Sequence, residues 1–325
     1  MKKLLTHAVT FARIETALKP FADQISPLII DDQGQMSHPW GESEADGAIV
    51  FGNTDAFFGP AAREFFKTVL TLEKLDWFQS SAAGLEHPML QAIGGKADVY
   101  TSSHQQSEAI AEWVLWAGFD YFQRGVERRK AQAEAQWIRL PFREISSTHW
   151  LILGFGGIGQ AVGRRIRALG GTVTGVRRSG GEDPGANEII SINEVPSYLT
   201  RADVVLLCLP HTPDTENIAG ADFFAAMKPE TLFINVGRGA LVDETALLAG
   251  LDAGRPAHAA LDVFQVEPQP ADGAFWHRND VTMTAHMSAT TAQARARTDT
   301  VFLDNLALFL AGREMKNTVP ASEFS

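Results

Sequence analysis

The sequence predicts an α/β protein with two Rossmann-like domains, each built on a doubly wound parallel sheet, and with a cleft between them. Three observations predict this architecture. An apolar run at residues 151–153 leads directly into residues 154–159, which read G-x-G-x-x-G, and a helical pattern follows. Short apolar runs and helical patterns alternate along both halves of the chain, as they do where helical crossovers join parallel strands. A length of 325 residues is enough for two such domains, each with its own core.

Composition and charge limit the classes of partner. A formal net charge of -11 disfavours nucleic acid or an anionic membrane surface. The single cysteine excludes an intramolecular disulfide and is typical of a reducing compartment, so we expect the cytoplasm. No stretch approaches the ~18 apolar residues of a membrane helix. The histidines other than His286, which is discussed below, do not have the spacing of metal ligands, so we expect no metal.

The glycine turn at residues 154–159 predicts a dinucleotide site because it lies between a strand and a helix. Gly154 permits the tight turn, Gly156 lets a pyrophosphate approach the backbone, and Gly159 lets helix and strand pack closely. The free N–H groups at the start of the helix then face the phosphates. The expected cofactor contacts in this turn come from Gly154, Gly156, Gly157, Ile158 and Gly159.

The residues after the next strand, 172–176, indicate which dinucleotide is bound. An NAD site places Asp or Glu there, on the ribose 2′-hydroxyl. This chain has Arg177, Arg178 and Ser179 instead, and its first carboxylate is Glu182. Guanidinium groups bind a phosphate through paired, charge-assisted hydrogen bonds, so the sequence favours NADPH over NADH. The alternative interpretation is a solvated basic loop.

The first half has no glycine fingerprint of its own. We expect strands at residues 27–30, 47–51, 75–79 and 97–100, with the best helix at 61–72. Small residues at 80–84 follow a strand, and their backbone N–H groups could meet an anion; a plain strand-to-helix turn is the alternative.

A long helical pattern at residues 107–135 carries many aromatic side chains. It suggests a domain-crossing or dimer-forming element, although an ordinary core helix is equally compatible. We expect a domain boundary at its start. The final helix, at residues 290–310, could return the chain to the first domain, and we expect residues 320–325 to be loose.

Three residues of the second half follow expected strands at 231–236, 257–264 and 281–285. They are Arg238, Glu267 and His286. Ligands of open parallel sheets bind beyond the carboxyl ends of the strands, so these side chains fit one mechanism. Each of them alone has an ordinary structural explanation, as a surface charge, a turn acid or a core histidine.

The chain resembles the D-isomer-specific 2-hydroxyacid dehydrogenase family. The matching segments are the glycine turn and residues 209–215, 235–243, 262–268 and 282–289. Through residues 177–179 and its length it is most similar to the glyoxylate/hydroxypyruvate reductase branch. The resemblance implies a homodimer and hydride transfer between NAD(P)H and a small 2-keto acid. It also implies a discontinuous, flavodoxin-like substrate domain at 1–106 and 289–325, and a dinucleotide-binding Rossmann domain at 107–288.

The resemblance also implies roles for residues. His286 is the general acid, Glu267 orients that imidazole and favours its charged form, and Arg238 grips the substrate carboxylate. Asp262 meets the nicotinamide carboxamide. Backbone at Ala83 and Gly84 holds the carboxylate from the other domain. Further cofactor contacts are implied at Pro210, Thr215 and Val236.

Two departures from the family pattern stand out: Thr284-Ala285-His286 replaces Thr-Pro-His, and Gly84-Leu85-Glu86 replaces Gly-Val-Asp. The second puts the fit of the substrate pocket in doubt. Two alternatives therefore stay open. One is a D-lactate or phosphoglycerate-like dehydrogenase of the same fold. The other is a non-catalytic NAD(P)-sensing protein, which the intact set of Arg, Glu and His disfavours.

Overall fold

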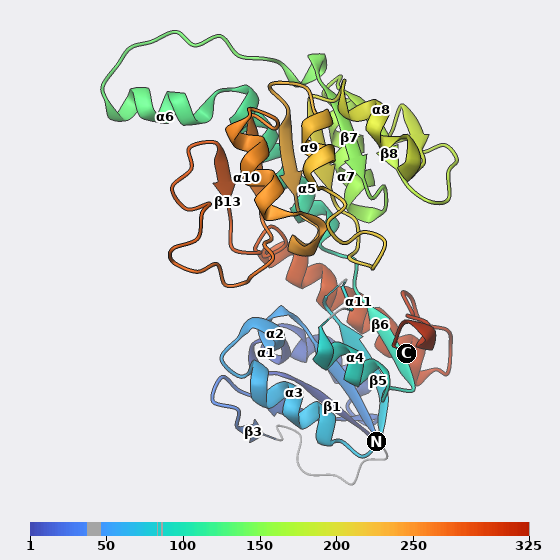
Figure 1. Cartoon of the computed structure of the whole chain (residues 1–325). Helices are drawn as coiled ribbons and strands as arrows, with labels where there is room; N and C mark the ends of the chain where they lie inside the picture. The colour runs from blue at the N-terminus through green and yellow to red at the C-terminus, as the bar shows by residue number, and fades with distance from the viewer. Residues whose placement is uncertain (38–46, 83, 86, 325) are drawn as a thin grey trace. The chain divides into compact units, whose positions relative to one another are not determined.

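The computed structural model describes residues 1–37, 47–82, 84–85 and 87–324. The chain forms two compact units (Figure 1). The first unit consists of Met1–Gln105 and Thr291–Ser325, and the second of Gln106–Thr290. Each unit is built on its own mostly or wholly parallel sheet. The expected α/β class with two doubly wound sheets is thereby confirmed.

The sheet of the first unit has the strand order β3-β2-β1-β4-β5-β6. Only β3 pairs antiparallel. The strands are β1 (Lys2–His7), β2 (Ile25–Ile30), β3 (Met36–Ser37), β4 (Ala48–Gly52), β5 (Leu75–Ser80) and β6 (Val99–Ser102). Sequence analysis missed β1 because it has only two consecutive aliphatic residues, and the polar Thr6 and His7 that follow are buried with them.

Helices cover both faces of this sheet. They are α1 (Ala8–Leu18), α2 (Thr54–Phe58), α3 (Ala62–Thr71), α4 (Pro88–Gly94) and α11 (Ala292–Leu310). On one face Phe302 of α11 stacks on Phe51 with ring centroids 4.1 Å apart, and it also stacks on Trp77. The expectation of a loose tail at residues 320–325 is wrong for the described part of it, and Ser325 lies outside the described residues. Ala321–Phe324 form a short 3-10 helix whose Phe324 ring lies 4.8 Å from Tyr100.

The sheet of the second unit is wholly parallel, in the order β13-β12-β11-β10-β7-β8-β9. Its strands are β7 (His149–Leu153), β8 (Thr172–Val176), β9 (Glu188–Ile190), β10 (Val204–Leu207), β11 (Leu232–Asn235), β12 (His258–Leu261) and β13 (Val281–Met283). From β7 the chain first builds outward through β8 and β9. It then returns to place β10 on the other side of β7. The switch point of this sheet, where ligands of such folds bind, therefore lies between β7 and β10.

Two layers of helices enclose this sheet. One layer contains α5 (Ser107–Phe122) and α7 (Gly157–Ala168), with Val114 and Ile166 packed on Trp150. The other contains α8 (Val195–Leu199), α9 (Ala221–Ala226) and α10 (Glu244–Asp252), with Phe224 and Leu247 packed on Phe233. Among the described residues, no helix is long and apolar enough to cross a membrane.

The long helical pattern at residues 107–135 is two helices, which corrects the expectation of one. Arg124 adopts a left-handed conformation (φ 58°) and ends α5, and α6 (Gly125–Ala133) starts beside it. A β-carbon on Gly125 would overlap the Asp120 carboxylate as it is placed, so a larger residue at this bend would displace that side chain. Figure 1 shows α6 and the chain after it standing out from the sheet of their unit.

An ion cluster around the buried Asp203 carboxylate anchors the point where this projecting segment returns to the sheet. Arg143 Nη1 and Lys228 Nζ lie 2.6 and 2.5 Å from Asp203 Oδ1. The backbone N–H of His149 donates to Asp203 Oδ2 at 2.7 Å. Burial raises the pKa of Asp203. These hydrogen bonds and the neighbouring Arg143 charge lower it by more than burial raises it, so the pKa lies below its usual range.

Candidate active site

The glycine turn between β7 and α7 shows a different constraint at each glycine. Gly154 has a φ of +101°, and a β-carbon there would lie 2.6 Å from the Cys208 carbonyl oxygen. A β-carbon on Gly159 would lie 2.5 Å from the Gly154 carbonyl oxygen, so helix and strand approach as closely as they can. A β-carbon on Gly156 would meet nothing within 4 Å. The first two glycines are required by the protein itself, and the third leaves open space above the turn.

That open space lies at the N-terminus of α7, which begins at Gly157. The N-cap residue is Gly156, which has no side chain to cap the first N–H groups of the helix. The N–H groups of the first turn have no acceptor within the helix, and the helix dipole adds positive potential there. A pyrophosphate fits this combination of donors and space.

The loop after β8 does not present its three polar residues equally. Arg177 is turned inward and donates to atoms of its own loop, including the Asp183 carboxylate at 3.2 Å. Arg178 is 84% exposed, and its nearest carboxylate in the described chain is that of Asp214, 3.9 Å away. Ser179 is exposed. Arg178 and Ser179 can therefore meet a ligand as they stand, whereas Arg177 cannot without breaking its own contacts.

The other expected cofactor contacts lie on segments that follow β10 and β11. Thr215 is buried, and its hydroxyl donates to the Pro210 carbonyl (2.9 Å) and accepts from the Thr212 N–H (2.8 Å), which closes this loop. Val236 is buried, and its N–H donates to Leu207. Pro210 is exposed. Thus only the backbone or the exposed faces of these residues can reach a cofactor.

Arg238 is held in a turn between two glycines at the carboxyl end of β11. The Asn235 side chain accepts from the Gly237 N–H (3.0 Å) and donates to the Arg238 carbonyl (2.9 Å). A β-carbon on Gly239 would collide with the backbone of Phe264, so this turn lies against the chain after β12. Sequence reasoning missed that Asn235 holds the turn that carries Arg238. Its position as the last residue of a strand before G-R-G was the available signal.

Glu267 and His286, which are 19 residues apart in sequence, form a hydrogen-bonded pair. Glu267 Oε2 lies 2.8 Å from His286 Nδ1, and Glu267 Oε1 accepts from the Phe264 N–H at 2.9 Å. Burial raises the pKa of Glu267, but the hydrogen bonds from His286 and Phe264 lower it more. The positive charge of Arg238 lowers the pKa of Glu267 as well, so the carboxylate stays ionised below the usual range. The three predicted site residues of the second unit therefore act on one another.

Asp262 organises the segment that carries His286. It is only 1% exposed. Its Oδ1 accepts from the Thr284 hydroxyl (2.5 Å) and the Met287 N–H (2.9 Å), and its Oδ2 accepts from the Ser288 N–H (3.0 Å). The His286 N–H donates to the Asp262 carbonyl at 2.7 Å. These bonds hold His286 at a φ of +50°, a left-handed conformation that is unfavourable for histidine and is common at functional sites.

Not every predicted residue can be placed in this site. Gly84 follows β5 in the first unit, and Ala83 lies outside the described residues. The Cys208 thiol lies beneath the glycine turn and donates to the Gly154 carbonyl at 3.0 Å. Burial raises the pKa of this thiol to about 12, so it is a structural group. Within the described part of the chain, no three His, Cys, Asp or Glu side chains are placed to hold a metal ion.

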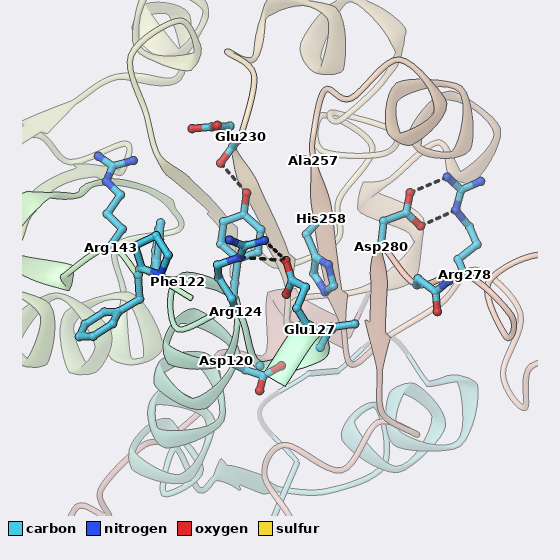
Figure 2. A pocket seen from close by; sticks show the side chains of 16 residues that line it. Asp120, Phe122, Arg124, Glu127, Arg143, Glu230, Ala257, His258, Arg278 and Asp280 are labelled. Atoms are coloured by element: carbon cyan, nitrogen blue, oxygen red, sulfur yellow. Dashed lines mark hydrogen bonds and ion pairs between the residues drawn. The ribbon is translucent and has the colours of Figure 1, made fainter. Parts of the chain in front are cut away.

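A hollow of about 1030 Å³ lies at the opposite edge of this sheet (Figure 2). Its walls include Glu230, Ala257 and Asp280, which precede β11, β12 and β13, and it also borders α5 and α6. The Tyr121 hydroxyl donates to the Glu230 carbonyl at 2.8 Å within it. Arg238 and His286 lie beyond the carboxyl ends of the same strands, so this hollow is separate from the candidate active site.

An imidazole–carboxylate pair and a guanidinium, at the edge of the sheet that carries a dinucleotide turn, provide acid–base chemistry beside a redox cofactor. This combination defines the class of dinucleotide-dependent oxidoreductases. Residues 116–288 match the family model described as "D-isomer specific 2-hydroxyacid dehydrogenase, NAD binding domain". The chain belongs to the D-isomer-specific 2-hydroxyacid dehydrogenase family, which confirms the resemblance, and it is an NAD(P)-dependent dehydrogenase.

Individual relatives and a solved structure that are similar to this chain carry names from the same family. A glyoxylate/hydroxypyruvate reductase A from Yersinia enterocolitica is 32% identical over 205 residues, which is 63% of this chain and 65% of that protein. A glyoxylate/hydroxypyruvate reductase B from Citrobacter koseri is 36% identical over 52% of each chain. The solved structure of a D-isomer specific 2-hydroxyacid dehydrogenase from Xanthobacter autotrophicus, in complex with NADPH and MES, is 25% identical. It has a TM-score of 0.76 and covers 100% of this chain and 99% of that one.

Proposed function

We propose that the protein uses NADPH to reduce a small 2-keto acid of the glyoxylate or hydroxypyruvate type to the D-2-hydroxy acid, or catalyses the reverse reaction. The observation that carries the proposal is the 2.8 Å contact between His286 Nδ1 and Glu267 Oε2, with Arg238 close enough to lower the pKa of Glu267. A sensor that only bound a dinucleotide would have no use for an imidazole oriented by a carboxylate.

The residues divide the work of the reaction. The bound dinucleotide supplies the hydride that is transferred to the keto carbon. Arg238 binds the substrate carboxylate and places its permanent charge near the keto oxygen. Glu267 accepts from Nδ1–H of His286, so that Nε2 faces the substrate and donates its proton to the oxygen as negative charge develops there. The products are a hydroxyl group and a neutral imidazole, which regains its proton from solvent.

Three observations support NADPH as the preferred reductant and leave NADH as a second possibility. No carboxylate side chain stands at the end of β8 to bind a ribose 2′-hydroxyl, and Arg178 and Ser179 are exposed there. The similar dehydrogenase from Xanthobacter autotrophicus was solved with NADPH.

The buried thiol of the one cysteine is compatible with the cytoplasm, where we place the reaction.

A screen of NADPH oxidation tests the proposal. Purified protein is assayed with glyoxylate, hydroxypyruvate, pyruvate and phosphohydroxypyruvate, and the product is resolved by chirality. We expect turnover with the first two acids, D-product from hydroxypyruvate, and loss of most turnover in His286→Ala without loss of NADPH binding. His277→Ala, at an exposed histidine away from these contacts, is the control. NADPH binding without turnover of any acid would favour the sensor, and preference for phosphohydroxypyruvate would favour a phosphoglycerate-like enzyme.

We further propose that the protein is a homodimer joined through the segment after α6. Trp137 is 96% exposed, and Ile138 and Phe142 are about half exposed, which is costly for an isolated chain. Phe142 also borders the hollow of Figure 2, so the exposed apolar side chains and the hollow belong to one surface. In a symmetric dimer the apolar side chains of each copy can pack into the hollow of the other. Sedimentation should show a dimer that Trp137→Ala or Ile138→Ser weakens. Ile192→Ser, at an exposed isoleucine elsewhere, should leave the dimer intact.

A further inference from the structure

The guanidinium of Arg177 is used entirely within the loop that follows β8. Nε donates to the Gly180 carbonyl (2.8 Å), Nη2 donates to the Glu182 carbonyl (3.2 Å), and Nη1 pairs with Asp183 Oδ2 (3.2 Å). All three nitrogen atoms therefore have partners, and the side chain is only 23% exposed. This is the geometry of a side chain that closes a loop.

Asp183 connects this loop to the helix of the glycine turn. Its Oδ2 also accepts from Gln160 Nε2 at 3.0 Å, and its Oδ1 accepts from the Gly185 N–H at 2.9 Å. Gln160 lies in the first turn of α7, three residues after Gly157. We call the set Arg177, Asp183 and Gln160 the clasp. It ties the end of β8 to the part of α7 that faces the open space above Gly156.

Inside the clasp, the chain between Arg177 and Asp183 turns sharply outward. Gly180 and Gly181 have φ values of +56° and +82°, which other residues rarely adopt. Arg178 and Ser179 precede these glycines and are exposed. The clasp therefore fixes both ends of a short segment in which Arg178 and Ser179 directly follow Arg177, and the exposed Glu182 lies beyond the two glycines.

We infer that Arg177 is a positioning residue: together with Asp183 it holds Arg178 and Ser179 where they meet the 2′-phosphate of NADPH, and it does not bind that phosphate itself. This inference rests on the proposed preference for NADPH and deepens it. It departs from the expectation that all three residues contact the phosphate.

Two physical effects follow from the clasp. A loop that is ordered before binding loses less conformational entropy when the ligand arrives, which is worth about a 3- to 10-fold gain in affinity for a few immobilised side chains. The Asp183 carboxylate would repel a phosphate nearby, and Arg177 neutralises it while holding it in place. If Arg177 only positions the loop, removal of the Asp183 carboxylate weakens phosphate binding. If Arg177 binds the phosphate directly, the same change leaves binding unchanged or tightens it, and this difference makes the inference testable.

The first measurement is calorimetric binding of NADP⁺, NAD⁺ and 2′,5′-ADP to the full chain. The variants are Arg177→Ala, Arg177→Lys, Asp183→Asn, the double variant Arg177→Ala/Asp183→Asn, and Arg178→Ala, with Arg201→Ala as a matched arginine control. We expect Asp183→Asn to weaken 2′,5′-ADP about 3- to 10-fold although it removes a negative charge, and the double variant to bind no worse than Arg177→Ala alone. Arg177→Lys should lie between Arg177→Ala and wild type, and Arg178→Ala should lose the most.

The inference is overturned if Asp183→Asn leaves 2′,5′-ADP binding unchanged or tightens it while Arg177→Ala weakens it as much as Arg178→Ala. That pattern would make Arg177 a direct phosphate ligand. Failure of the proposed cofactor looks different, because wild-type protein would then bind NAD⁺ as tightly as NADP⁺.

A second measurement tests whether the clasp orders the loop, and its result does not depend on which cofactor is preferred. Hydrogen exchange at residues 177–185 of the ligand-free protein should quicken in Arg177→Ala and in Asp183→Asn, and should stay as in wild type in Arg178→Ala and Arg201→Ala. Equal exchange in wild type and in both clasp variants would overturn the inference. Thermal unfolding midpoints show whether each variant is folded.

Discussion

Replacement of Asp262 by Asn tests whether this buried carboxylate holds His286, the proposed general acid, in place. The amide keeps the shape of the side chain but turns one acceptor oxygen into an NH₂ donor. That donor must face either the Ser288 N–H or the pair of donors from Thr284 and Met287. At least one hydrogen bond to a charged acceptor is therefore lost, which costs about 1.5–3 kcal/mol.

The expected consequence for catalysis comes from the backbone of His286. A left-handed conformation costs a residue with a β-carbon about 1–2 kcal/mol, and the Asp262 bonds are what maintain it at a φ of +50°. A loss of 1.5–3 kcal/mol is enough for the segment to relax, so we expect kcat to fall about 10- to 100-fold. The thermal midpoint should fall by several degrees.

The assay separates positioning from cofactor binding. Steady-state reduction of the best keto acid gives kcat and KM, and fluorescence titration gives the dissociation constant of NADPH. We expect kcat to fall with little change in the NADPH dissociation constant. Asp252→Asn, at a carboxylate whose side chain is 69% exposed, is the control and should change neither. A wild-type kcat in Asp262→Asn would refute the reasoning, and a large loss of NADPH affinity at unchanged kcat would favour the expected nicotinamide contact instead.

Three further outcomes are expected. Glu267→Gln should lower kcat about 10- to 100-fold. Because the pKa of Glu267 is lowered, its carboxylate should become protonated only at a pH below the usual glutamate range, and a pH–rate profile of wild-type kcat/KM should show its fall from that effect only there. Asp203 has a lowered pKa in the folded protein, so its contribution to stability should be complete above its unfolded pKa of about 4 and be lost as the pH falls through the folded value. Urea unfolding should show this acid dependence in wild type and a weaker one in Asp203→Asn. Gly156→Ala should leave the thermal midpoint nearly unchanged, because the added methyl enters open space, yet weaken NADPH binding at least 10-fold in a titration.

Features defined by contiguous residues were predictable from the sequence. The glycine turn is local, because each of its glycines has a backbone reason to be there. Strand ends were predictable too, since a parallel sheet brings all carboxyl ends to one edge, and this placed Arg238, Glu267 and His286 in one unit. The pairing of Glu267 with His286 was implied by the family resemblance, and residue spacing alone could not give it, because it depends on how two loops fold back.

Features that depend on distant partners were not predictable in this way. The inward orientation of Arg177 requires Asp183 and Gln160, and no local pattern distinguishes it from Arg178. The break between α5 and α6 depends on the left-handed conformation of Arg124, which apolar periodicity does not report. Asp262 was expected to meet the cofactor. Its three hydrogen bonds to the His286 segment follow from a loop conformation that sequence spacing does not encode.

The interrupted first unit has a consequence for how the chain folds during synthesis. Its sheet begins with β1, yet Phe51 and Trp77 lack the ring that stacks on them until α11 supplies Phe302. The ribosome adds α11 only after the whole of Gln106–Thr290 has been translated. The nascent chain must therefore carry a sheet whose aromatic rings are only partly covered while the inserted unit, which is one continuous segment, completes its own core. The part of the protein that is translated first is the part that finishes folding last.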